Sequence, residues 1–112
     1  MSKKLQFNIV LPADLGGDCE RQFLDVRKPQ ARLKSGLTIP GAVWRHPFDA
    51  LNWADEFAGG QVAIFCVHGH EVSKAVGGYL ADLGIDVALI EGGFESWREA
   101  GLPVTALESG DE

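Results

Sequence analysis

The sequence predicts an α/β fold with a largely parallel sheet. Two short runs, Val62–Phe65 and Val87–Ile90, contain only apolar residues, which is typical of strands covered on both faces. Between them, apolar residues recur at helical spacing up to Gly84. Strand, helix and strand joined by short glycine-containing turns form the parallel unit of layered α/β folds. We therefore expect a sheet with helices packed against it.

The other predicted elements are shorter. Residues 5–11 alternate in polarity, which predicts a strand with one buried face, and residues 22–26 form a second short strand. A turn is expected at residues 34–36, a helix capped by Asp49 that runs to about Ala58, and a short helix at residues 94–100. The helix from Asp49 is expected to have an apolar face made of Ala50, Leu51, Trp53, Ala54, Phe57 and Ala58. The helix before Gly84 is expected to have one made of Ala75, Val76, Tyr79, Leu80 and Leu83.

Composition and charge indicate one globular domain spanning residues 1–112, in the cytoplasm. The net charge of −6 argues against nucleic acid and anionic membranes as partners. No apolar run could cross a bilayer, and no signal-peptide pattern follows the first lysines. Cys19 and Cys66 are too few for a disulfide scaffold, so both are expected to be free thiols. Residues 106–112 are small, polar and acidic, and are expected to form a flexible tail.

Cys66 is the candidate reactive residue because it follows a buried strand and precedes a helix. A thiol in this position lies near unpaired backbone N–H groups and the positive end of a helix dipole. Both favour the nucleophilic thiolate, and the same N–H groups can hold an anion. The carboxyl end of a parallel strand is also where ligands bind in such sheets. On spacing alone, Cys66 could instead be an inert buried cysteine that ends a core strand.

Other polar residues are assigned no chemistry from spacing alone. The two carboxylates that flank Cys19 oppose thiolate formation, so Cys19 is interpreted as a bystander. Asp25 and Arg27 lie on the same side of a strand, and most such pairs are structural or surface ion pairs. His46 is more typical of a surface or packing histidine than of a catalytic one.

Several motifs, in order and spacing, resemble those of the rhodanese-like, single-domain sulfurtransferases from about Phe23 to Val104. These motifs are Leu24-Asp-Val-Arg27, Ile39-Pro-Gly-Ala42, the strand leading to Cys66-Val-His-Gly69, Gly84, Glu91-Gly-Gly-Phe94 with Trp97, and Gly101-Leu-Pro-Val104. The resemblance implies a rhodanese-like fold, with a mostly parallel sheet of about five strands flanked by helices on both faces. It also implies a thiosulfate sulfurtransferase-like enzyme in which Cys66 accepts a sulfane sulfur, becomes a persulfide and passes the sulfur on.

The resemblance further implies roles for individual residues. Cys66 would be the catalytic nucleophile, and Asp25 and Arg27 would be structural supports. The anion-binding loop, whose N–H groups would stabilise the persulfide as an oxyanion hole does, would comprise Val67, His68, Gly69, His70, Glu71 and Val72. No cofactor or metal ion is implied. The expected donor is a small sulfur-containing anion, thiosulfate or another persulfide donor, and the expected acceptor is a thiol, cyanide or a thioredoxin-like protein.

Glu71 departs from the family pattern, because many members carry an arginine or a hydroxyl residue there. A carboxylate near Cys66 would repel the thiosulfate dianion and oppose thiolate formation. His68 and His70 would offset it when protonated. Alternatively, Glu71 points away and pairs with Lys74 on the same helix. The stretch from residue 9 to 23 is also too short and glycine-rich for the helix the family often has there.

Three other functions are compatible with parts of the pattern. A related class of phosphatases needs an arginine six residues after the cysteine, but that position is Val72. Cys66, His68 and His70 could bind a metal ion, but a curled loop would not aim alternate residues at one point, and only His46 could supply a fourth ligand. A non-catalytic rhodanese-like module for protein binding or regulation is the third, although binding alone needs no thiol.

Overall fold

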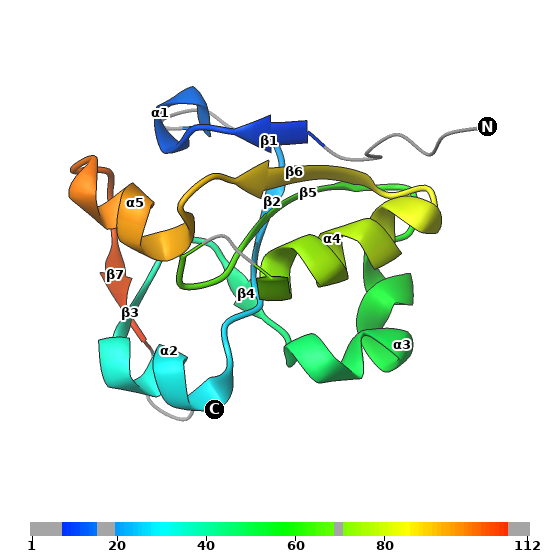
Figure 1. Cartoon of the computed structure of the whole chain (residues 1–112), viewed down its shortest axis with the longest axis horizontal. Helices are drawn as coiled ribbons and strands as arrows, with labels where there is room; N and C mark the ends of the chain where they lie inside the picture. The colour runs from blue at the N-terminus through cyan, green and yellow to red at the C-terminus, as the bar shows by residue number, and fades with distance from the viewer. Residues whose placement is uncertain (1–7, 16–19, 69–70, 108–112) are drawn as a thin grey trace.

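The computed structural model describes residues 8–15, 20–68 and 71–107, and within these residues the central element is a five-stranded parallel sheet (Figure 1). Its strands, in spatial order, are β1 (Asn8–Val10), β6 (Asp86–Ile90), β5 (Gln61–Phe65), β2 (Gln22–Asp25) and β4 (Val43–Trp44). A second, antiparallel sheet pairs β3 (Leu37–Thr38) with β7 (Thr105–Ala106). The predicted fold class, a mostly parallel sheet of about five strands flanked by helices, is confirmed.

Helices lie around this sheet. They are α1 (Pro12–Leu15), α2 (Pro29–Ser35), α3 (Ala50–Trp53), α4 (Glu71–Asp82) and α5 (Gly93–Glu99), with 3₁₀ turns at Pro47–Asp49 and Ala54–Phe57. Figure 1 shows α3 and α4 together towards the right of the view, and α5 beyond the arrowhead of β6. No helix in the described part of the chain is long and apolar enough to span a membrane.

Two apolar cores cover the two faces of the sheet. Alternate residues of each central strand point to opposite faces, as the pleat requires. The first core contains Val62 and Ile64 of β5, Val87 and Leu89 of β6, Trp53 and Ala54 near α3, and Val76, Leu80 and Ala81 of α4. The second contains Ala63 and Phe65 of β5, Ile90 of β6, Ile39, and Phe94 and Trp97 of α5. Burial on both faces explains why the two central strands have no polar alternation.

The prediction of one continuous helix from Asp49 to Ala58 is wrong. One α-helical turn, α3, lies between two 3₁₀ turns, and the tighter 3₁₀ winding rotates the side chains out of the predicted stripe. Trp53 is buried, and its indole N–H donates to the carbonyl of His46 at 2.8 Å. Leu51 is 82% exposed and Ala58 is also exposed. The Asp49 carboxylate accepts from the side chain of Asn52 and makes no cap hydrogen bond to the backbone.

The predicted buried stripe of α4 is partly correct. Val76 and Leu80 are buried, but Ala75 is exposed and Leu83, just past the end of the helix, is 49% exposed. The buried face turns instead through Ser73, Val76, Gly77, Leu80 and Ala81. Gly77 faces β6, where an added Cβ would lie 3.5 Å from Val87 Cγ1, so its small size allows close packing of helix and sheet.

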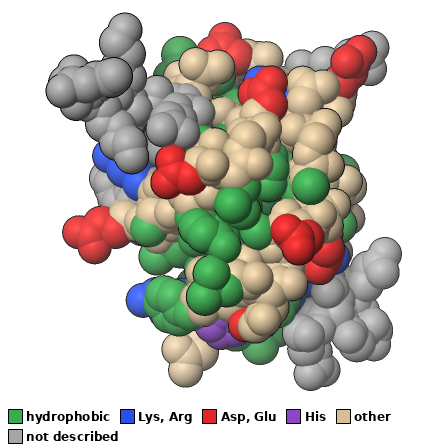
Figure 2. Space-filling view, turned by 90° about the vertical axis from the view of Figure 1, so that its right-hand side faces the viewer, with side chains coloured by type: hydrophobic (Ala, Val, Ile, Leu, Met, Phe, Trp, Pro, Cys, Tyr) green, Lys and Arg blue, Asp and Glu red, His purple; other side chains and the backbone are tan. Residues whose placement is uncertain are grey.

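Some apolar side chains are left on the surface. Figure 2 shows hydrophobic side chains gathered across the middle of the face that looks to the right in Figure 1, with acidic side chains scattered around them. Large apolar residues exposed in and around the helices are Leu33, Phe48, Leu51 and Leu83. The helix-face predictions therefore counted as core some residues that the fold leaves in contact with solvent.

The first strand does not bury one face as predicted. β1 pairs only with β6, at the edge of the sheet, and Ile9 and Leu11 are exposed. An edge position gives a strand fewer neighbours on either face, which explains this exposure. A single helical turn, α1, follows β1, consistent with too little chain for a longer helix. Leu5, Phe7 and Cys19 lie outside the described residues.

Helix α2 was not predicted, although its end signals are present in the sequence. Pro29 stands at the start, where a missing N–H costs nothing, and Lys28 before it is extended. Gly36 ends the helix at φ +71°, and its N–H donates to the carbonyl of Arg32. The predicted turn at residues 34–36 is therefore the end of a helix.

The predicted flexible tail begins too early. Ala106 pairs with Leu37 between β7 and β3, and the Leu107 N–H donates to the carbonyl of Gly36 at 3.0 Å. These two residues are therefore attached to the fold by backbone hydrogen bonds. Residues 108–112 lie outside the described residues.

Candidate active site

The carboxyl ends of β2 and β5 lie side by side and bring two of the predicted motifs together. Asp25 is in register with Phe65, and the Val26 N–H donates to the Phe65 carbonyl at 3.0 Å. The residues that follow, Arg27 and Cys66, therefore lie at the same edge of the sheet. Cys66 is only 7% exposed.

A cavity of about 470 Å³ opens at this edge. Its lining residues are Arg27, Lys28, Ala31, Cys66, Val67, His68, Glu71 and Val72. Five of the residues predicted for the loop site thus share one cavity with Arg27. Lys28 and Ala31 were not predicted, because they enter through the unpredicted helix α2. Gly69 and His70 lie outside the described residues, so the anion-binding role of the whole loop stays a prediction.

Helix α5 holds the backbone at Cys66 from one side. The N–H of Phe94 donates to the carbonyl of Cys66 at 2.7 Å, and the N–H of Glu95 donates to the carbonyl of Val67 at 3.1 Å. Gly92 and Gly93 form the turn before these donors, and their φ values of +78° and +64° are unfavourable for residues other than glycine. The Glu91-Gly-Gly-Phe94 motif therefore attaches the first turn of α5 to the loop that carries the thiol.

Helix α4 contacts the thiol itself. The Cys66 Sγ lies 3.2 Å from the Ser73 Oγ, and the Ser73 side chain is fully buried. Ser73 was not predicted as a site residue. The available signal was its spacing, since it stands three and seven residues before Val76 and Leu80 on the buried side of the same helix. A hydroxyl in this apolar face requires a polar partner, and the thiol provides one.

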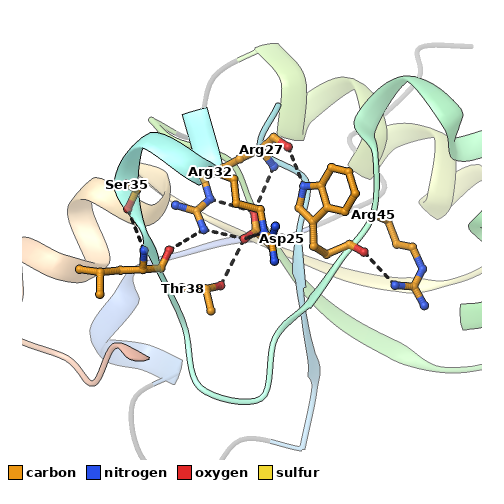
Figure 3. Close-up of polar contacts among 8 residues, drawn as sticks. Asp25, Arg27, Arg32, Ser35, Thr38 and Arg45 are labelled. Carbon is orange, nitrogen blue, oxygen red and sulfur yellow. Dashed lines mark hydrogen bonds and ion pairs between the residues drawn. The ribbon is translucent and has the colours of Figure 1, made fainter. Parts of the chain in front are cut away.

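Arg27, which lines the cavity, forms a buried ion pair with Asp25 (Figure 3). The Nε and Nη2 of Arg27 donate to the two carboxylate oxygens of Asp25 at 2.9 and 2.7 Å, and both side chains are 1% exposed. The Asp25 carboxylate also accepts from the Arg27 backbone N–H and from the Thr38 hydroxyl. Arg27 donates in addition to the carbonyl of Leu37 at 2.7 Å. This buried, bidentate pair differs from the weak surface pairs that the spacing also allowed.

A second arginine shares the carboxylate of Asp25. Arg32 of α2 is buried, and its Nε lies 3.7 Å from the same Asp25 carboxylate. Its guanidinium stacks 5.2 Å from the ring of Trp44, whose indole N–H donates to the carbonyl of Arg27. The guanidinium of Arg27 lies 4.5 Å from the ring of Phe94. Two guanidiniums thus share one carboxylate, and one of them lines the Cys66 cavity.

His68 borders two cavities. The second, of about 480 Å³, is lined also by Lys74, Glu91, Glu95 and Glu99 among others. Glu71 lines the Cys66 cavity and Lys74 lines this second one. This placement does not favour the alternative in which Glu71 turns away towards Lys74.

His46 lies away from the thiol. Its Nδ1 accepts from the Phe48 N–H at 3.1 Å, and it lines a smaller cavity with Lys28 and Phe48. Across residues 8–15, 20–68 and 71–107, no three His, Cys, Asp or Glu side chains are grouped so as to hold a metal ion. His70, a proposed ligand in the metal alternative, lies outside those ranges.

The model of the rhodanese-like domain family matches residues 12–100, which span strands β2, β5 and β6, the Cys66 loop and α5. The chain belongs to the rhodanese-like domain family. A solved rhodanese-related protein from Thermoplasma volcanium is 27% identical, with a TM-score of 0.75, and the match covers 88% of this chain and 98% of that one. The family predicted from the motifs is thus confirmed.

Other solved structures similar to this rhodanese-like chain have different descriptions. A thiosulfate sulfurtransferase from Pseudomonas aeruginosa is 26% identical with a TM-score of 0.73, and the match covers 92% of this chain but 20% of that one. A protein of unknown function from Rhodopseudomonas palustris, described as a possible tyrosine phosphatase, is 25% identical with a TM-score of 0.76, covering 88% of this chain and 85% of that one. The fold is therefore compatible with more than one chemistry, and the residues at Cys66 must decide between them.

The buried Asp25–Arg27 pair yields a stability prediction. Asp25→Asn leaves two buried guanidiniums without their carboxylate, so the free energy of unfolding should fall by about 3–5 kcal/mol. Glu56→Gln, which removes the exposed pair with Arg45, should cost less than about 1 kcal/mol. Urea unfolding of both variants measures the two free energies of unfolding. If both variants lost less than about 1 kcal/mol, burial would not strengthen the Asp25–Arg27 pair.

The turn before α5 yields a second prediction. An alanine Cβ at Gly92 would lie 2.4 Å from the Ser96 Cβ, in addition to its strained φ of +78°. Gly101 has the same φ with open space around it, so Gly101→Ala isolates the backbone strain. Gly92→Ala should lower the free energy of unfolding by about 3 kcal/mol and Gly101→Ala by about 1 kcal/mol. If urea unfolding gives the same loss for both, the contact with Ser96 does not constrain the turn.

Proposed function

We propose that this rhodanese-like chain is a sulfurtransferase that moves a sulfane sulfur through a persulfide on Cys66. The observation that carries the proposal is the thiol itself, which borders a cavity at the carboxyl end of β5 with cationic side chains nearby. A parallel α/β sheet binds ligands at that end of its strands. A purely structural cysteine would not need an adjoining cavity with two basic side chains.

The proposed reaction has two displacement steps. In the first, the Cys66 thiolate attacks the outer sulfur of thiosulfate, a bond forms between the two sulfurs, and sulfite leaves with the electron pair of the broken S–S bond. In the second, cyanide or an acceptor thiolate attacks that outer sulfur, and the Cys66 thiolate leaves with the electron pair. Cyanide becomes thiocyanate, and a thiol acceptor becomes a persulfide. No net redox change occurs and no cofactor is required.

Charge at the cavity bears on the donor. Arg27 and Lys28 favour an anion, whereas Glu71 repels one, and all three line the same cavity. We propose that Glu71 weakens the binding of the thiosulfate dianion and that persulfide donors of lower charge are better substrates. For the acceptor, we propose a small thiol or a thioredoxin-like protein.

A second candidate function is a module that binds a partner without transferring sulfur. The same carboxylate at the cavity favours it, because it makes the site less suited to an anionic donor. The two functions differ in whether Cys66 carries sulfur, which can be measured directly.

The first test is the intact mass of the protein. After mixing with excess thiosulfate, the mass should rise by one sulfur atom, about 32 Da, and return to its starting value on adding cyanide. Cys66→Ser should show no change, while Cys19→Ser should behave like the wild type. If neither thiosulfate, 3-mercaptopyruvate nor a small-molecule persulfide adds sulfur to Cys66, the binding module replaces the enzyme as the proposal.

The second test changes the charge at the cavity. Glu71→Arg replaces a repelling charge with an attracting one, so kcat/KM for thiosulfate should rise about ten-fold, chiefly through a lower KM. Asp82→Arg makes the same change in net charge at the far end of α4 and should alter kcat/KM less than about two-fold. Cyanide-dependent thiocyanate formation measures both. An unchanged or weaker use of thiosulfate by Glu71→Arg would show that Glu71 does not limit the donor.

A further inference from the structure

We propose that the Ser73 hydroxyl stabilises the Cys66 thiolate by donating a hydrogen bond to it, both when the thiolate attacks the donor and when it leaves the persulfide. The inference rests on the proposed sulfur transfer and assigns it a second residue. Its basis is the 3.2 Å separation of Ser73 Oγ and Cys66 Sγ, with Ser73 fully buried and Cys66 only 7% exposed.

The position of the hydroxyl is fixed by packing. Ser73 lies in the first turn of α4, and the next residues on the same face, Val76 and Leu80, pack into the core that also contains Cys66. A hydroxyl transferred from water to such a core costs free energy unless it is hydrogen-bonded. Its observed side-chain partner is the reactive sulfur. The packing of α4 therefore fixes the position of the Ser73 hydroxyl beside the Cys66 sulfur.

The hydroxyl can serve both protonation states of the sulfur. When Cys66 is a thiol, its S–H can donate to the Ser73 oxygen across the 3.2 Å separation. When Cys66 is a thiolate, rotation about the C–O bond lets the hydroxyl donate to the sulfur. The second arrangement is stronger because the acceptor is charged. The hydrogen bond therefore favours the thiolate over the thiol.

This preference affects the two steps in opposite ways. A stabilised thiolate is a weaker intrinsic nucleophile, so once Cys66 is fully ionised the hydrogen bond does not speed its attack. A stabilised thiolate is also a better leaving group, so the hydrogen bond speeds the release of sulfur from the persulfide. A residue that only filled space beside Cys66 would not change thiolate attack and sulfur release in opposite directions.

Other groups also act on the same sulfur. The charged or titratable side chains that share its cavity are Arg27 and Lys28 after β2, His68 in the loop, and Glu71 at the start of α4. Their effects remain in a variant that changes only Ser73. Ser73→Ala removes one oxygen from a buried helical position, so it isolates the hydrogen bond from these charges.

The test compares Ser73→Ala with Val76→Ala, which removes packing from the same core without touching a hydrogen bond. The rate of Cys66 alkylation by iodoacetamide is followed against pH, with Cys19→Ser as the common background. Ser73→Ala should move the midpoint of the profile upward by about one pH unit, the equivalent of one hydrogen bond to a charged group. Val76→Ala should leave the midpoint unchanged.

A single-turnover experiment then follows discharge of the preloaded persulfide to cyanide. Ser73→Ala should slow discharge about three-fold, while alkylation at pH values above both midpoints should be equal to or faster than in the wild type. An unshifted midpoint in Ser73→Ala, or the same shift in Val76→Ala, would overturn the inference. If no donor loads the wild type, the proposed function fails, and the alkylation midpoint by itself supports or overturns the hydrogen bond to the thiolate.

Discussion

The parallel pairing of β2, β5 and β6 is the constraint on which the candidate site depends. Because parallel strands end at a common edge, Arg27, Cys66 and the Gly92–Gly93 turn come together although they are far apart in sequence. A slip of one residue would move Phe65 to the opposite face and separate Arg27 from the rings it covers. The register that builds the two cores thus also builds the cavity.

Two helices hold Cys66 from opposite sides of the sheet. The first turn of α5, which packs in the core with Phe65, donates to the carbonyls of Cys66 and Val67. The first turn of α4, which packs in the core with Ile64, places Ser73 against the sulfur. Backbone and side chain of the same residue are therefore positioned by separate elements. This arrangement leaves the sulfur little freedom to move relative to the cavity.

Electrostatics around the cavity combine a buried and an exposed contribution. Asp25 pairs with the buried guanidiniums of both Arg27 and Arg32, and Arg27 also lines the cavity beside the thiol. Glu71, at the exposed start of α4, adds a negative charge to the same cavity and lies at the positive end of its own helix. The cavity beside Cys66 is thus lined by side chains of both charge signs.

The sequence by itself determined the sheet, the two central strands and the position of Cys66, because continuous apolar runs, glycine turns and a cysteine at a strand end are local signals. Only the tertiary structure decided the rest. Leu51 and Leu83 have the apolar character of core residues, but they are 82% and 49% exposed. Ser73 and Arg32 are polar residues typical of surfaces, yet both are buried because the sulfur of Cys66 and the carboxylate of Asp25 lie within reach. In each case the partner stands seven residues earlier, in or just after the strand that precedes the helix, and the pattern of one helix cannot show that the fold brings the two side chains together.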